Sequence, residues 1–220
     1  MKLFNLLFAA LAVVLCVALV PVQAELIQIG LTAYVDGVYD PYGFLGGNVH
    51  TGDTITGSYK YESTTPDSNP SNLNLGSYWW YATPAGISLT VGGLEFKTNP
   101  DNVVFTILID NDGTDSYWCT SYSNNPLSSE VFVDTIGWSL SVPLALENIF
   151  SSDALLTTAP ILSQWEPSSN HLTISGGKGG EPPYDQPFNI ASHVTFVNLV
   201  PEPATLCLLA LGGLFLRRRF

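Results

Sequence analysis

Short segments of alternating polar and apolar residues recur along the chain between residues 25 and 200. A period of two, with many β-branched and aromatic side chains, is typical of strands, and no apolar stripe with the 3.6-residue period of a helix persists. The predicted strands are 26–34, 54–61, 87–91, 94–97, 103–110, 116–122, 131–142, 171–175 and 190–199. This pattern predicts an all-β fold, a single β-sandwich or jelly-roll-like domain.

Glycine, proline and asparagine clusters separate these segments. Residues 91–94 and 110–113 are typical of tight hairpin turns, since Gly-Gly and Asp-Gly tolerate positive φ angles. The polar stretches 64–76, 124–129 and 176–187 are predicted to be surface loops. A short helical turn is predicted near residues 151–156, where a serine can cap its first N–H groups.

The first 24 residues have the pattern of a secretory leader. Lys2 precedes a run over residues 3–20 that is apolar apart from Asn5, and Val22-Gln23-Ala24 places small residues where signal peptidase requires them. We therefore expect cleavage between Ala24 and Glu25. The alternative is an N-terminal transmembrane anchor, because the apolar run is long for a leader.

The last twenty residues have a three-part order. Pro201-Glu202-Pro203 is followed by a charge-free apolar segment over residues 204–216, and then by Arg217-Arg218-Arg219. Thirteen helical residues reach only ~20 Å, less than the ~30 Å hydrocarbon core. The arginines favour the cytoplasmic side, so we expect a marginal C-terminal transmembrane helix that holds the precursor in the membrane.

This order resembles a PEP-CTERM sorting signal. The resemblance implies recognition by an exosortase, a membrane-embedded cysteine transpeptidase of diderm bacteria, and delivery of the protein to the cell surface or exopolysaccharide matrix. The expected organisation is a signal peptide at 1–24, a β-sandwich domain at 25–200 and a sorting tail at 201–220.

Charge is distributed unevenly along the chain. Between residues 25 and 200 there are three lysines and no arginine against eighteen acidic residues, a formal balance of −15. Such a domain repels nucleic acid and anionic lipid surfaces, so nucleic acid is excluded as a partner.

The body also resembles uncharacterised exported bacterial proteins that carry the same tail. The similar segments are TGSYKY at 56–61, TPDSN at 65–69, SLTVGG at 88–93 and SDALLTT at 152–158. These are strand and turn patterns, so the resemblance supports the β-sandwich and implies no activity.

No catalytic motif is found in the body. The Gly-x-Ser-x-Gly elbow of hydrolases is missing, and His50, His171 and His193 lie far apart in the sequence. Cys119 is the only cysteine between the two ends, and it has the neighbours of a buried strand residue. We therefore expect no enzymatic activity and no cofactor, with a secreted hydrolase of hidden paired carboxylates as an alternative.

Three acidic residues cluster on one predicted turn. Asp110, Asp112 and Asp115 offer the oxygen ligands that Ca²⁺ prefers. The EF-hand spacing fails, because Leu108 and Cys119 fall where carboxylates belong when Gly113 takes the sixth position. An acidic hairpin without an ion explains the same residues, so calcium remains a minor alternative to no metal.

Consecutive aromatic residues are the most unusual local feature. In an extended segment, Trp79, Trp80 and Tyr81 cannot all face one core, because successive side chains point to opposite faces. If these rings are exposed, they provide a flat platform for binding sugar rings. If they pack under a loop, they instead cover the open end of the sandwich.

These observations together predict an exported, exosortase-processed protein of the surface or matrix with a structural or adhesive role. The first alternative is a carbohydrate-binding module that uses Trp79, Trp80 and Tyr81 to bind exopolysaccharide. The second is the secreted hydrolase.

Overall fold

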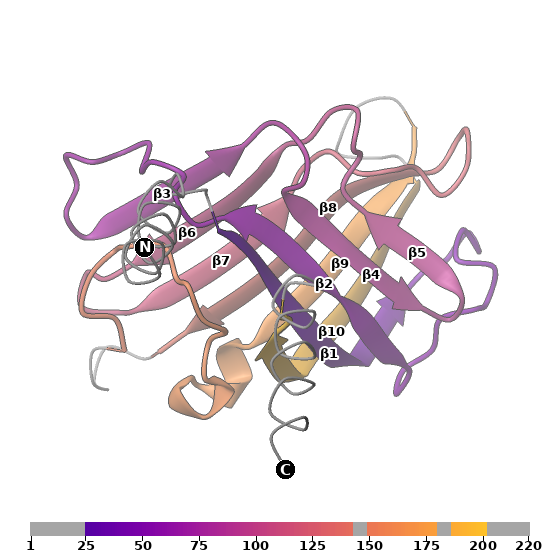
Figure 1. Cartoon of the computed structure of the whole chain (residues 1–220). Coiled ribbons are helices and arrows are strands. Elements are labelled where there is room, and N and C mark those ends of the chain that lie inside the picture. The colour runs from indigo at the N-terminus through magenta and orange to yellow at the C-terminus, as the bar shows by residue number, and fades with distance from the viewer. Residues whose placement is uncertain (1–24, 143–148, 180–185, 202–220) are drawn as a thin grey trace, which may run out of the picture.

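The computed structural model describes residues 25–142, 149–179 and 186–201. Ten strands form one antiparallel sheet in the order β3-β6-β7-β8-β9-β10-β1-β2-β4-β5 (Figure 1). The strands are β1 (Leu26–Tyr39), β2 (Thr54–Glu62), β3 (Leu75–Trp80), β4 (Gly86–Val91), β5 (Leu94–Lys97), β6 (Phe105–Asp110), β7 (Ser116–Ser121), β8 (Phe132–Ser141), β9 (His171–Lys178) and β10 (Gln186–Leu199). The predicted all-β fold is confirmed.

The sheet curls so that its two halves face each other across a common core (Figure 1). β2 and β4 cross over β7 and β8, as in a sandwich, but both layers belong to one continuous sheet. Tyr59 on β2 contacts Trp138 on β8, with ring centroids 6.1 Å apart. Curling of this kind follows from the twist of adjacent strands, which turns the sheet progressively until its apolar faces meet.

The first and last strands lie in the middle of the sheet. β1 pairs with β10 in antiparallel register from Ile29–Leu199 to Tyr39–Asn189. Beyond the last strand residue, the N–H of Val200 donates to the carbonyl of Gln28 at 2.8 Å. The two ends of the body therefore lie side by side.

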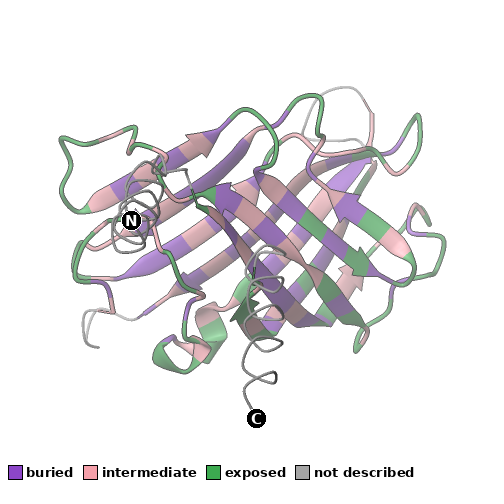
Figure 2. Cartoon of the chain, viewed as in Figure 1, coloured by how far each residue is buried: buried purple, intermediate pink, exposed green. Residues whose placement is uncertain are grey.

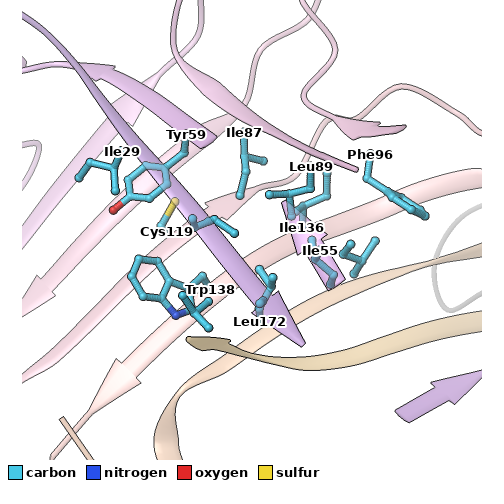
Figure 3. Close-up of a cluster of buried hydrophobic side chains, with 14 of the residues drawn as sticks. Ile29, Ile55, Tyr59, Ile87, Leu89, Phe96, Cys119, Ile136, Trp138 and Leu172 are labelled. Carbon is cyan, nitrogen blue, oxygen red and sulfur yellow. The ribbon is translucent and has the colours of Figure 1, made fainter. Parts of the chain in front are cut away.

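Alternate residues of each strand are buried, which produces the banded colouring of Figure 2. On β4, for example, Ile87, Leu89 and Val91 are inside, whereas Ser88 and Thr90 are exposed. The buried faces join in the single apolar cluster that Figure 3 shows in part. This alternation is the pattern from which the strands were predicted.

Large aromatic residues fill the middle of this core. Tyr117 and Trp138 pack edge to face with centroids 5.7 Å apart. The hydroxyl of Tyr117 donates to the hydroxyl of Tyr59 at 3.0 Å. Because burial disfavours the charged form of a phenol, it raises the pKa of Tyr59 and Tyr117, and both side chains stay neutral.

The hairpin predicted at residues 91–94 is confirmed. Val91 pairs with Leu94, and Gly92 and Gly93 have φ angles of 58° and 78°. A Cβ atom on Gly92 would also collide with the carbonyl oxygen of Asn48, so the turn requires glycine there.

Four local predictions are corrected. β3 begins inside the predicted loop 64–76, and β9 and β10 extend into the predicted loop 176–187. Residues 151–153 form a bend and residues 154–156 have no regular structure, and the short 3₁₀ helices are instead η1 (Leu162–Gln164) and η2 (Pro167–Ser169). Asp110 pairs with Ser116, so the connection after β6 is a five-residue loop and not a two-residue turn.

Cys119 is fully buried among the core side chains (Figure 3), and burial raises the pKa of its thiol. Because the thiolate is the reactive form, we expect iodoacetamide to leave Cys119 unmodified in the native protein and to alkylate it in guanidinium chloride. Peptide mass spectrometry separates Cys119 from Cys16 and Cys207. Equal rates of alkylation in both conditions would contradict the buried position.

Candidate functional site

The aromatic segment lies on β3, at one edge of the sheet. Its residues alternate: Tyr78 and Trp80 are buried, whereas Trp79 is partly exposed on the outer face. The hydroxyl of Tyr78 donates to the carbonyl of Asp153 at 3.0 Å, which fixes the inner side of the strand. As expected from the sequence, consecutive rings face opposite sides, because this segment is a regular strand.

Three aromatic side chains line up on the outer face, and we call this set the aromatic face: Trp79, Tyr81 and Tyr122. The centroids of Trp79 and Tyr81 are 6.3 Å apart with planes 10° apart, and those of Trp79 and Tyr122 are 6.2 Å apart with planes 18° apart. Tyr81 is 70% exposed and Tyr122 is 50% exposed. The three rings are therefore nearly parallel and accessible to solvent.

Hydrogen bonds position these rings. The indole Nε1 of Trp79 donates to the Oγ atom of Ser77 at 3.0 Å, which orients its ring on the strand. The N–H of Tyr122, directly after β7, donates to the carbonyl of Val104 at 2.9 Å. The aromatic face therefore rests on strand ends that are held in register, an arrangement that favours a precise binding surface.

Trp80 does not belong to this face. It is 6% exposed, and the centroid of its ring lies 5.6 Å from the ring centroids of Tyr61 and of Phe105 in the core. The set predicted from the sequence is corrected accordingly: Trp79 and Tyr81 are accessible, Trp80 is a core residue, and Tyr122 joins them. Tyr122 was missed because only the pairing of β3 with β6 and of β6 with β7 brings it near β3.

Asp110 ends β6, Asp112 and Asp115 lie in the loop that follows, and their carboxylates have separate partners. Asp115 is 2% exposed, and its Oδ2 atom accepts the N–H of Phe150 at 2.6 Å. Asp110 accepts the N–H of Asp112 at 3.0 Å within the loop. In the parts of the chain that the structure describes, no group of three or more His, Cys, Asp or Glu side chains is arranged to hold a metal ion.

The three histidines lie apart, as their sequence positions indicate. His193 on β10 is partly exposed, and its Nδ1 atom lies 2.7 Å from a carboxylate oxygen of Asp36 on β1. In an exposed turn, the Nδ1 atom of His50 lies 3.7 Å from the Oδ2 atom of Asp53. His171 is the first residue of β9. The His193–Asp36 pair connects the two central strands on their outer side.

Cavities of about 330, 170 and 160 Å³ are formed by the described residues. None of the three is lined by an aspartate or glutamate of that part of the chain. The paired carboxylates of a glycoside hydrolase would have to face each other across such a cleft.

The predicted residues at the two ends fall mostly outside the described ranges. Glu25 is exposed directly before β1, and Pro201 is exposed directly after Val200. Ala24, Glu202, Pro203 and Arg217-Arg218-Arg219 lie outside the described residues. Among residues 25–142, 149–179 and 186–201, no helix is both long and apolar enough to cross a membrane.

Comparison with known proteins identifies the C-terminal residues. The family model of the PEP-CTERM protein-sorting motif matches residues 199–219. No curated protein and no solved structure matches the chain. The match coincides with the Pro-Glu-Pro motif, the apolar segment and the arginines. The chain therefore carries a PEP-CTERM sorting signal and is an exported protein directed to an exosortase.

Proposed function

We propose that this protein is a structural and adhesive component of the cell surface or exopolysaccharide matrix, and that it attaches by binding carbohydrate on its aromatic face. The observation that carries the proposal is the nearly parallel alignment of Trp79, Tyr81 and Tyr122 on the outside of the sheet. Flat exposed rings contact the C–H groups of sugar rings over a large apolar area.

The aromatic face is built for contact with a flat ligand. Trp79 is held by its bond to Ser77, so little side-chain freedom is lost when a sugar ring packs against it. The hydroxyl groups of Tyr81 and Tyr122 are available as donors and acceptors at the edge of the same surface. Apolar contact with a polar rim is typical of specific binding surfaces.

The proposed binding is tested with Trp79→Ala and Tyr122→Ala, singly and together. We expect the double variant to bind the organism's own exopolysaccharide at least about tenfold more weakly than wild type, because two of the three stacking rings are removed. Affinity electrophoresis in gels that contain the polysaccharide measures this loss, and circular dichroism confirms that the sheet remains.

Phe196→Ala is the matched control, because Phe196 is 59% exposed on β10 and lies outside the aromatic face. It should leave the mobility shift unchanged. Unchanged binding by the Trp79/Tyr122 double variant, or an equal loss in Phe196→Ala, would refute carbohydrate binding by this surface.

A further inference from the structure

The largest of the three cavities, about 330 Å³, lies beside β2, β4 and β5. Its polar lining consists of Ser58, Lys60, Thr83, Ser88, Lys97 and Thr98. Pro84, Pro100 and Val103 contribute apolar contacts from the loops at residues 81–85 and 98–104. A volume of this size is within the range of small-ligand sites, which extends from about 300 to 1,000 Å³.

The charge of this cavity is opposite to that of the domain. The body has three lysines against eighteen acidic residues, yet two of those lysines, Lys60 and Lys97, line this one cavity. No aspartate or glutamate of the described residues lines it. Two ammonium groups beside several hydroxyls attract an anion and can hydrogen-bond to its oxygens.

Strand register places these groups together. Ser58 pairs with Ser88, and Ser88 pairs with Lys97, so the three residues form one row across β2, β4 and β5. Two residues further along the same face of β2, Lys60 pairs with Gly86. The side chain of Thr98, another lining residue, packs where a Cβ atom of residue 86 would lie. The lysines therefore border the cavity from its two outer strands.

Neither lysine is neutralised by a buried acid. Lys97 forms an ion pair with Glu95 at 2.7 Å, but both side chains are exposed, and exposed pairs contribute little free energy and exchange readily. Within the described part of the chain, Lys60 forms no ion pair. Both ammonium groups remain able to bind an external anion.

The cavity adjoins the aromatic face along the chain. Tyr81 is two residues from Thr83, so their Cα atoms lie within ~7 Å of each other. Tyr122 donates its N–H to Val104, the neighbour of the lining residue Val103, and the N–H of Asn99 donates to Ser123. The same two loops thus border the aromatic face and the cavity.

We propose that this cavity binds the anionic group of an acidic polysaccharide whose adjacent sugar rings pack on the aromatic face. The inference rests on the proposed carbohydrate binding and specifies its ligand class as glycans that carry carboxylate, sulfate or phosphate. A lysine ammonium group is a compact charge and does not impose the fixed two-donor geometry of arginine. Carboxylate, sulfate and phosphate groups can therefore bind to Lys60 and Lys97 in the same way.

The test compares the exported protein on alginate, dextran sulfate, phosphorylated dextran and neutral dextran, in EDTA to exclude bridging cations. At about 0.15 M salt the Debye length is ~8 Å, so distant carboxylates of the domain are screened and contacts inside the cavity persist. We expect wild type to bind at least one acidic polymer about tenfold more tightly than dextran. The preferred polymer identifies the anionic group.

Lys60→Gln/Lys97→Gln should abolish this preference and leave dextran binding unchanged. The matched control is Lys178→Gln, which removes the third lysine of the body, paired with Glu130 at 2.6 Å on the surface. It should leave the preference for acidic polymers intact. An equal loss in Lys178→Gln would show that overall charge governs binding, and the inference would be wrong.

Two further outcomes separate this inference from the proposed function. Equal binding of acidic and neutral polymers by wild type would overturn the anion site and leave carbohydrate binding standing. If no polymer binds, carbohydrate binding fails, and the cavity is tested alone by titrating inorganic sulfate, inorganic phosphate and glucuronate. Amide shifts at Ser58 and Ser88 that disappear in the double variant support the site, and unchanged spectra overturn it.

Discussion

The exported protein is expected to keep Phe220 when Pro201, Glu202 and Pro203 are all replaced by alanine, whereas the wild-type protein loses its terminal arginines. The substitution removes the recognition element but leaves the apolar segment 204–216 and the arginine cluster unchanged. The precursor should therefore still be held at the membrane, uncut. Intact masses of both proteins, from hosts with and without the exosortase, measure the effect.

Replacing Arg217, Arg218 and Arg219 by alanine is the matched variant. It should act on an earlier step, because thirteen apolar residues are too short to hold themselves across the bilayer without a charged cytoplasmic end. We expect less precursor in the membrane fraction and more full-length protein released. If wild type and the motif variant keep Phe220 in both hosts, the segment is a simple tether and the tail is not processed.

Trp138→Ala is expected to remove a large share of the stability of the domain. Trp138 is 1% exposed, it contacts Tyr59 and Tyr117, and its Nε1 donates to Oδ1 of Asn170 at 3.0 Å. Truncating a buried tryptophan leaves a cavity and costs about 3–5 kcal/mol of unfolding free energy. Because a domain of this kind has roughly 5–15 kcal/mol in total, Tm should fall by ~6–20 °C.

The hydrogen bond to Asn170 makes this site particularly sensitive. The Oδ1 atom of Asn170 also accepts the N–H of Val194 at 3.2 Å, and its Nδ2 atom donates to the carbonyl of Val194 at 2.6 Å. Trp118→Ala is the matched control, since Trp118 lies on the neighbouring strand β7 but is partly exposed. Guanidinium unfolding should show a much smaller loss for Trp118→Ala. Equal losses would mean that Trp138 is not a central core residue.

Periodicity was sufficient for the strands that bury every second residue. β2, β4 and β5 were predicted nearly to the residue, because each shows clear alternation between recognisable turns. β3 was missed because only one of its outward positions, Ser77, is polar, and the next outward position carries a large aromatic ring, Trp79. One polar residue in six positions is too weak an alternation of polarity to mark a strand.

The candidate sites depend on contacts that no local pattern contains. Tyr122 joins Trp79 only through the pairing of β3, β6 and β7, and Lys60 and Lys97 meet only through that of β2, β4 and β5. In the acidic loop, by contrast, residues that are close in the sequence are separated by the fold. Asp115 looked like a surface ligand beside Asp110, but the fold turns it inward to the N–H of Phe150, 35 residues away.

The central position of β1 and β10 links folding to export. In a chain that is exported from its N-terminus, β1 emerges first and β10 last, yet each is the partner that the other needs to complete the sheet. A partly exported chain therefore has its first strand without the neighbour on one side, and the core cannot close. The sheet is completed only once residue 199 has crossed the membrane, immediately before the sorting motif arrives. With that order of export, completion of the fold comes directly before the tail is exposed for processing.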